Sequence, residues 1–277
     1  MTKKFNLAQA RKLLPNRNHT DNKTAGGKSL IIAGSQGFFG AAVLAATAAA
    51  RVGAGYVTLM TDQKKFSSVA HPDFLTLDFK KNILFDTYSS VAVGPGLGQS
   101  AQALTLLKKI IKSKPTKTVL DADALNLLAQ IQIKALPSTW ILTPHEGELA
   151  RLLKTTSEVI KKNRLQALRQ AQIKFKCVVL LKGHKTLVAN TKNEIYEIQS
   201  GNVSLAKAGT GDVLTGIISG LLAQGLNPTE AACLGSFLHG KISDNWLKRK
   251  NDVLSLMASD LLSEIPNTLA TLRSKKS

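Results

Sequence analysis

Residues 201–220 read GNVSLAKAGTGDVLTGIISG, in which a glycine-containing loop runs directly into an apolar segment. After the loop, apolar residues recur at the spacing of one helical face: Val213, Leu214, Ile217, Ile218, Leu221 and Leu222. The first turn of a helix leaves backbone N–H groups without internal partners and carries the positive end of the helix dipole. The sequence therefore predicts a loop that opens into a buried helix, with an anion-binding site where the two meet.

Asp212 lies at this junction, just after Gly209 and Gly211, which lack a Cβ and let the backbone approach a ligand closely. A carboxylate at this position has two interpretations. It is either a base beside a bound anion or the N-cap of the helix, a role that Asp fills well. The polar approach at residues 201–202 favours the base, but the loop alone leaves both interpretations open.

The composition indicates one soluble domain that meets anionic partners. The chain has 277 residues, which suits a single α/β domain spanning residues 1–277, and Lys plus Arg outnumber Asp plus Glu by 37 to 18. We expect residues 1–28 to be a basic, solvated lead-in with at most one short helix. The longest apolar stretch, residues 41–50, is short and precedes Arg51, so we expect a cytoplasmic protein without a membrane anchor. Cys177 and Cys233 have no metal-type spacing, and we expect neither disulfides nor zinc.

Short apolar segments alternate with helical patterns along most of the chain, as in parallel βαβ units. The segments that we expect to be strands are 29–33, 56–60, 90–93, 118–120, 140–142 and 177–181. Glycines or polar residues follow several of them, at the sheet edge where open α/β sheets bind ligands. Residues 187–189 and 194–198 predict an antiparallel edge. Helices are expected at 41–52, 101–111, 157–173 (basic and solvated), 229–246 and 253–262.

Six motifs occur in a characteristic order: GSQGFFGAA, VGPGLG, LDADALNLL, LTPHEGE, LKG and AGTGDVLTGIISGLLAQG. Together they closely resemble the ADP- or ATP-dependent NAD(P)H-hydrate dehydratases, and the resemblance covers residues 29–240. It implies a ribokinase-like three-layer αβα sandwich, in which a mostly parallel central sheet with an antiparallel edge lies between two helix layers.

The resemblance also implies roles for individual residues. Asp212 would be the catalytic base. Residues in the turn after 177–181 and in the glycine loop would bind ADP or ATP: Lys182, Gly183, His184, Lys185, Thr186, Gly209, Thr210 and Gly211. A second set would contact hydrated NADH or NADPH: Ala41, Gly96, Gly98, His145 and Asp212. Taken alone, Lys182 and Lys185 would also suit an exposed β-turn, which is the less favoured alternative, and the role of His145 depends on its TPHEGE context.

The activity that the resemblance implies is the repair of hydrated NADH or NADPH. A phosphoryl group from ADP or ATP, with Mg²⁺, would first be moved to the ring hydroxyl, because hydroxide is a poor leaving group, and phosphate would then depart. We expect a homotetramer that works with a separate NAD(P)H-hydrate epimerase. Asp121 or Asp123 could hold a water-coordinated Mg²⁺, but a helix N-cap explains Asp123 equally well, so no metal ligand is assigned.

The chain departs from the family pattern at three places. Residues 22–27, NKTAGG, keep only the lysine and the final glycine of a His-Lys-Gly-aromatic-Gly run. Ser204 and Lys207 stand where Gly and Thr are more usual, and Glu146 stands where Pro is frequent. Lys207 would add a cation near the phosphoryl path.

Two other function classes are considered. A kinase of the same fold that phosphorylates a vitamin-precursor alcohol would share the glycine loop. A nucleic-acid-binding protein would explain the net charge of +19, but aromatic residues make up only 5% of the chain and we find no RNP, KH, zinc-finger or helix-turn-helix pattern. The sequence therefore favours an enzyme that acts on nucleotides, with neither nucleic acid nor a membrane as a partner.

Overall fold

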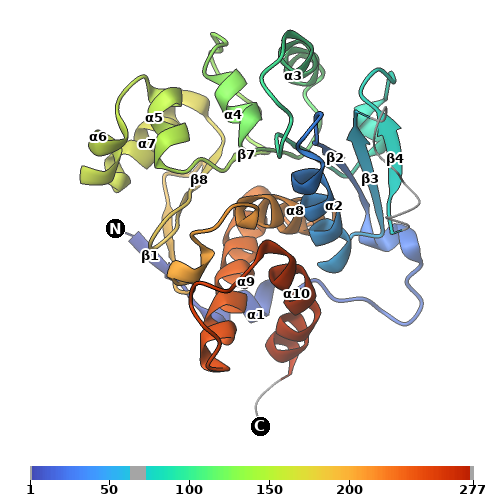
Figure 1. The fold of residues 1–277 in the computed structure, drawn as a ribbon, viewed down its shortest axis with the longest axis vertical. Coiled ribbons are helices and arrows are strands. Elements are labelled where there is room, and N and C mark those ends of the chain that lie inside the picture. Colours follow the sequence, from blue (N-terminus) through green and yellow to red (C-terminus); the bar gives the residue numbers. More distant parts are fainter. Residues whose placement is uncertain (1, 63–72, 275–277) are drawn as a thin grey trace.

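A sheet of mostly parallel strands forms the centre of the computed structural model, which describes residues 2–62 and 73–274 (Figure 1). Its strands lie in the order β1-β10-β9-β8-β7-β6-β5-β2-β3-β4. The bounds are β1 Thr2–Phe5, β2 Lys28–Ile32, β3 Tyr56–Thr61, β4 Leu75–Asp78, β5 Ser90–Val93, β6 Thr118–Leu120, β7 Trp140–Leu142, β8 Val178–Leu181, β9 Leu187–Ala189 and β10 Ile195–Ile198. Strand β9 pairs antiparallel with both β8 and β10. The predicted parallel sheet with an antiparallel edge is confirmed.

Helices cover both faces of the sheet, and each face has its own buried apolar cluster. In Figure 1 one layer contains α3 Ala101–Ser113, α4 Asp123–Leu128, α5 Glu146–Leu153, α6 Ser157–Lys162 and α7 Arg164–Phe175. The other contains α1 Leu7–Leu13, α2 Phe39–Arg51, α8 Thr210–Ala223, α9 Pro228–Lys248 and α10 Ala258–Arg273. Because the central strands are covered on both faces, their sequences are almost entirely apolar.

Helix α8 is buried on every side, beyond the single apolar face that its sequence predicts. The six predicted core positions are buried, and so are Thr215 and Ser219 on the other side. The Ser219 hydroxyl lies 2.8 Å from that of Ser29 and 3.2 Å from that of Ser90, so these polar groups are satisfied inside the core. Close packing against α2 depends on glycine, because a Cβ at Gly216 would lie 2.1 Å from the Ala45 carbonyl oxygen.

The prediction for residues 1–28 is correct only in part: most of the described residues there are exposed and one short helix, α1, is present, but the segment also adds a strand to the sheet. Strand β1 pairs in parallel with β10 along the outer side of the antiparallel strands, and Phe5 and Ala10 are buried. Asn6 starts α1 with a capping box. Basic residues hid this strand because only one of its four side chains faces the core.

Two helix predictions also need correction. The expected solvated helix over 157–173 is two helices, α6 and α7, which meet at Asn163 and bury Ile160, Leu168 and Phe175. The helix expected at 253–262 instead begins at Ala258 and continues to Arg273, with Pro266 inside it. Among the described residues, no helix is both long enough and apolar enough to cross a membrane.

Candidate active site

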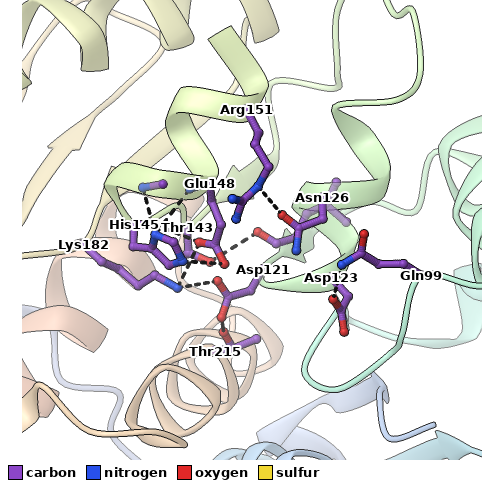
Figure 2. A network of polar contacts seen from close by, with 12 residues as sticks. Gln99, Asp121, Asp123, Asn126, Thr143, His145, Glu148, Arg151, Lys182 and Thr215 are labelled. Carbon is purple, nitrogen blue, oxygen red and sulfur yellow. Dashed lines mark hydrogen bonds and ion pairs between the residues drawn. The ribbon is translucent and has the colours of Figure 1, made fainter. Parts of the chain in front are cut away.

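The loops at the carboxyl ends of the central strands bring one lysine and several carboxylates together (Figure 2). Asp121 follows β6, Lys182 follows β8, and Glu148 lies on α5. The Lys182 ammonium donates a 2.7 Å hydrogen bond to Asp121 Oδ1 and lies 3.5 Å from Glu148 Oε2. Thr215, on α8, donates to the other Asp121 oxygen at 2.6 Å. This network ties three strand-end loops to the central helix.

Lys182 carries the positive charge that makes this arrangement possible. Asp121 is 1% exposed and Glu148 is 5% exposed, and buried carboxylates are costly unless they are paired. Burial alone would lower the pKa of Lys182, but the charges of Asp121 and Glu148 outweigh it and raise that pKa. Lys182 therefore stays protonated and pairs with both carboxylates.

Asp212 is the third residue of α8, so the N-cap interpretation is wrong. The N-cap is Gly209, at φ +86°, and no side chain caps this helix. No hydrogen bond to the Asp212 carboxylate is found within residues 2–62 and 73–274. Burial, followed by the nearby charge of Asp121, raises the pKa of Asp212 to about 7. An unbonded carboxylate with this proton affinity is suited to accept a proton near neutral pH.

A cavity of about 400 Å³ opens beside the glycine loop. The β8–β9 turn from Lys182 to Thr186 lines one wall, and Thr210 and Gly211 lie at the start of α8. His239 also lines the cavity; burial lowers its pKa to about 4, so the ring is neutral. A carbonyl oxygen can only accept a hydrogen bond, so Nε2 of His239 donates to the Thr210 carbonyl oxygen at 2.9 Å. This bond anchors the first residue of α8.

The residues predicted to contact the dinucleotide lie outside that cavity. Ala41 and Gly96 are neighbours, since a Cβ at Gly96 would lie 3.2 Å from the Ala41 Cβ. The Gly98 N–H donates to Asp123 at 2.9 Å. His145 is the N-cap of α5, where its Nδ1 accepts from the N–H groups of residues 147 and 148, and its Nε2 lies 3.3 Å from Glu148. His145 thus belongs to the Lys182 network, whereas Ala41 neighbours Gly96 and Gly98 bonds to Asp123.

The carboxylates of this edge do not form a ready Mg²⁺ site. Both oxygens of Asp121 already accept hydrogen bonds, from Lys182 and Thr215. Asp123 is the first residue of α4 rather than its N-cap, and its oxygens accept from Gly98 and Gln99. Within the described part of the chain, no three His, Cys, Asp or Glu side chains are grouped as metal ligands. The residues present therefore do not fit a resident cation, and no step is assigned to one.

The departures from the family pattern have specific structural consequences. The Lys207 ammonium donates to the Leu254 carbonyl oxygen at 2.5 Å, so its charge is engaged there. Ser204 bonds to the Asn202 side chain and stabilises the loop ahead of α8. Glu146 lies 3.2 Å from Arg164, a residue that the sequence analysis did not select. Thr215 was missed too, although it lies three residues after Asp212 and so faces the same way on the helix.

The sequence model of one protein family, described as Carb_kinase: NAD(P)H-hydrate dehydratase, matches residues 29–267. The chain belongs to the NAD(P)H-hydrate dehydratase family. Among its relatives, the ADP-dependent (S)-NAD(P)H-hydrate dehydratase of Neisseria meningitidis serogroup B is 39% identical, over 88% of this chain and 86% of that protein. The bifunctional NAD(P)H-hydrate repair enzyme Nnr of Moorella thermoacetica is 36% identical over 96% of this chain.

Solved structures agree with the assignment to the dehydratase family. The ADP/ATP-dependent NAD(P)H-hydrate dehydratase of Bacillus subtilis, co-crystallised with ATP and Mg²⁺, has a TM-score of 0.89 and is 28% identical, covering 98% of this chain and 99% of that one. A ribokinase-like superfamily protein of Enterococcus faecalis has a TM-score of 0.88 at 26% identity, covering 98% of this chain and 96% of that one. The ribokinase-like fold is thereby confirmed. The chain spans about half the length of the bifunctional relatives that it matches.

Proposed function

We propose that this chain dehydrates hydrated NADH or NADPH, with ADP or ATP as the phosphoryl donor, and so restores the reduced dinucleotide. The observation that carries the proposal is the Asp212 carboxylate, which has no hydrogen-bond partner among the described residues and a pKa of about 7 at the start of α8. Membership of the dehydratase family supports the choice of substrate.

The proposed reaction begins with Asp212 taking the proton of the ring hydroxyl. The hydroxyl oxygen bonds to the terminal phosphorus of the nucleotide, and the bond between that phosphorus and the departing AMP or ADP breaks. Backbone N–H groups at the start of α8 would stabilise the transferring phosphoryl group. The lone pair of the ring nitrogen then expels phosphate, and loss of a proton from the neighbouring carbon restores the double bond.

We assign two binding regions to the reactants. The adenine nucleotide would occupy the 400 Å³ cavity, which is lined by Lys182, Gly183, His184, Lys185, Thr186, Thr210 and Gly211. Gly209, which does not line the cavity, would contribute as the N-cap of α8. The hydrated dinucleotide would lie toward Ala41, Gly96, Gly98 and His145, and Asp212 would stand where the two reactants meet. Any Mg²⁺ would arrive with the nucleotide phosphates rather than be held in advance by the protein.

The proposal also covers the assembly, the cellular location and the partner enzyme. We propose a homotetramer in the cytoplasm, functionally linked to an NAD(P)H-hydrate epimerase that converts the unusable epimer into substrate. The longer relatives are bifunctional NAD(P)H-hydrate repair enzymes, which supports such a link.

Product analysis tests the function against the kinase alternative. The protein is incubated with hydrated NADPH and with ADP or ATP. Recovery of the absorbance of the reduced ring together with phosphate release is expected, whereas a plain kinase gives a stable phosphate ester without recovery. A stable ester, or no reaction with either nucleotide, contradicts the proposal.

Nucleotide placement has its own test. In the double variant Lys182→Ala, Lys185→Ala, the dissociation constant for ADP should rise, most strongly at low salt, because two cations beside the cavity are lost. A dissociation constant that is unchanged at both low and moderate salt would mean that the nucleotide binds elsewhere.

A further inference from the structure

The Arg164 side chain binds the backbone of the β8–β9 turn. Its guanidinium donates to four carbonyl oxygens, at 3.4 Å to Leu181, at 3.0 Å to Lys182, at 3.4 Å to Lys185, and also to His184. Three of these residues line the cavity, whereas Arg164 does not. One side chain thus fixes the direction of most of the peptide groups in the turn.

Glu146 completes this support. Its Oε1 lies 3.2 Å from Arg164 Nε, and the two side chains are only 23% and 19% exposed. Glu146 is the first residue of α5 and directly follows the loop after β7. That loop also contacts the turn, because the Lys182 N–H donates to the Pro144 carbonyl oxygen at 2.8 Å. The pair therefore joins the loop that carries His145 to the turn that borders the cavity.

Two further observations indicate that this arrangement is specific rather than incidental. Arg164 is the first residue of α7, where a cation opposes the helix dipole, so helix stability does not account for it. Gly183 has φ +132°, and a Cβ there would lie 2.7 Å from Glu146 Oε1 and 2.9 Å from Arg164 Nη2. The glycine in the turn thus gives the ion pair the space it occupies.

We propose that Arg164 and Glu146 are positioning residues for nucleotide binding, and this rests on the nucleotide placement proposed above. Carbonyl oxygens repel phosphate, and the four carbonyl oxygens that accept from Arg164 are held toward its guanidinium. The pair thereby keeps the turn in a shape that accepts an anion. Neither side chain touches the reacting atoms, so both act on affinity for the nucleotide rather than on the chemical step.

The test compares Arg164→Met with Arg169→Met. Arg169 lies on the same helix, is exposed, and has no side-chain bond within the described part of the chain, so it controls for the loss of charge. In Arg164→Met we expect the dissociation constant for ADP, measured by calorimetry, and the nucleotide KM to rise about tenfold, or about 1.4 kcal/mol, while kcat at saturating nucleotide stays within about twofold. Glu146→Gln should change the same quantities in the same direction, and less.

The double variant Glu146→Gln, Arg164→Met sharpens the result, because residues that act as a pair give effects that do not add. Three results would each overturn the proposal. The first is additive effects of the two substitutions, the second is an unchanged dissociation constant for ADP in Arg164→Met, and the third is a fall in kcat with an unchanged nucleotide KM. If Arg164→Met does not fold, Glu146→Gln decides the question alone. Calorimetry with ADP needs no turnover, so failure of this proposal is distinguishable from failure of the dehydratase reaction.

Discussion

Replacing Asp212 with Asn should stop catalysis and, above neutral pH, stabilise the protein. Asn has nearly the same shape but does not accept a proton as a base, and losing a general base typically costs about 10²–10⁴ in rate. We therefore expect kcat to fall at least about a hundredfold, or about 3 kcal/mol of barrier. Because Gly209 is the N-cap, the substitution removes no capping bond.

The effect on stability follows from the pKa. The folded protein raises the pKa of Asp212 from 3.8 to about 7, so the folded state binds the proton more tightly than the unfolded chain. Stability is then lost as pH rises from about 4 to about 7. A tenfold change in proton affinity is worth about 1.4 kcal/mol, which sets a ceiling of about 4 kcal/mol. Water reaches this partly exposed carboxylate, so we expect a gain of about 1–2 kcal/mol in Asp212→Asn at pH 8 and none below pH 4.

The assay combines kcat with urea unfolding at pH 4 and pH 8 on one preparation of each protein. Asp86→Asn serves as the control, because Asp86 is exposed and lies outside the site. A kcat within about fivefold of the parent would refute the role of Asp212 as a base. A variant that is less stable than the parent at pH 8 would refute the account of its charge.

Three further outcomes are expected. Gly216→Ala should lower the free energy of unfolding in urea by about 1–3 kcal/mol, because the added Cβ would lie 2.1 Å from the Ala45 carbonyl oxygen. The control Gly40→Ala, where a Cβ would have no neighbour within 4 Å, should not destabilise the protein, and equal effects of the two variants would contradict this packing. Burial lowers the pKa of His239 to about 4, so the contribution of His239 to stability falls as pH decreases from 6.5 to 4, opposite in sign to the contribution of Asp212 over the same range. His239→Gln should lack this contribution, and a stability difference between parent and variant that does not change with pH would contradict it. Light scattering should give four times the chain mass of 29.7 kDa, and a monomer at micromolar concentration would defeat the tetramer.

The fold was largely predictable because its strands are buried on both faces and read as uninterrupted apolar runs. Residues 90–93, 118–120 and 140–142 were predicted with the bounds that the structure has. Strands β1 and β4 were missed because they lie at the edges of the sheet, and their polar residues hide the pattern. Edge strands have fewer apolar neighbours, so their sequences are less constrained.

The site was predictable only in part. The motifs predicted Asp212 as the base and Lys182 as part of the nucleotide site because both stand in recognisable sequence patterns. The network around Lys182 depends on Thr215 and Glu148, and support of the turn depends on Arg164, which lies on a basic helix that looks solvated in sequence. Such partners come together only through tertiary packing, and no local spacing reveals them.

The pairing of β1 with β10 has a consequence for how the chain folds during synthesis. Thr2 leaves the ribosome well before Ile195, its partner in the sheet. At about 5–20 residues per second, the strand waits roughly 10–40 seconds for that partner to emerge. Contacts so distant in sequence also slow folding, because a long loop must close before they form. This edge of the sheet should therefore close late, and the nascent protein should become fully resistant to proteolysis only after β10 has emerged.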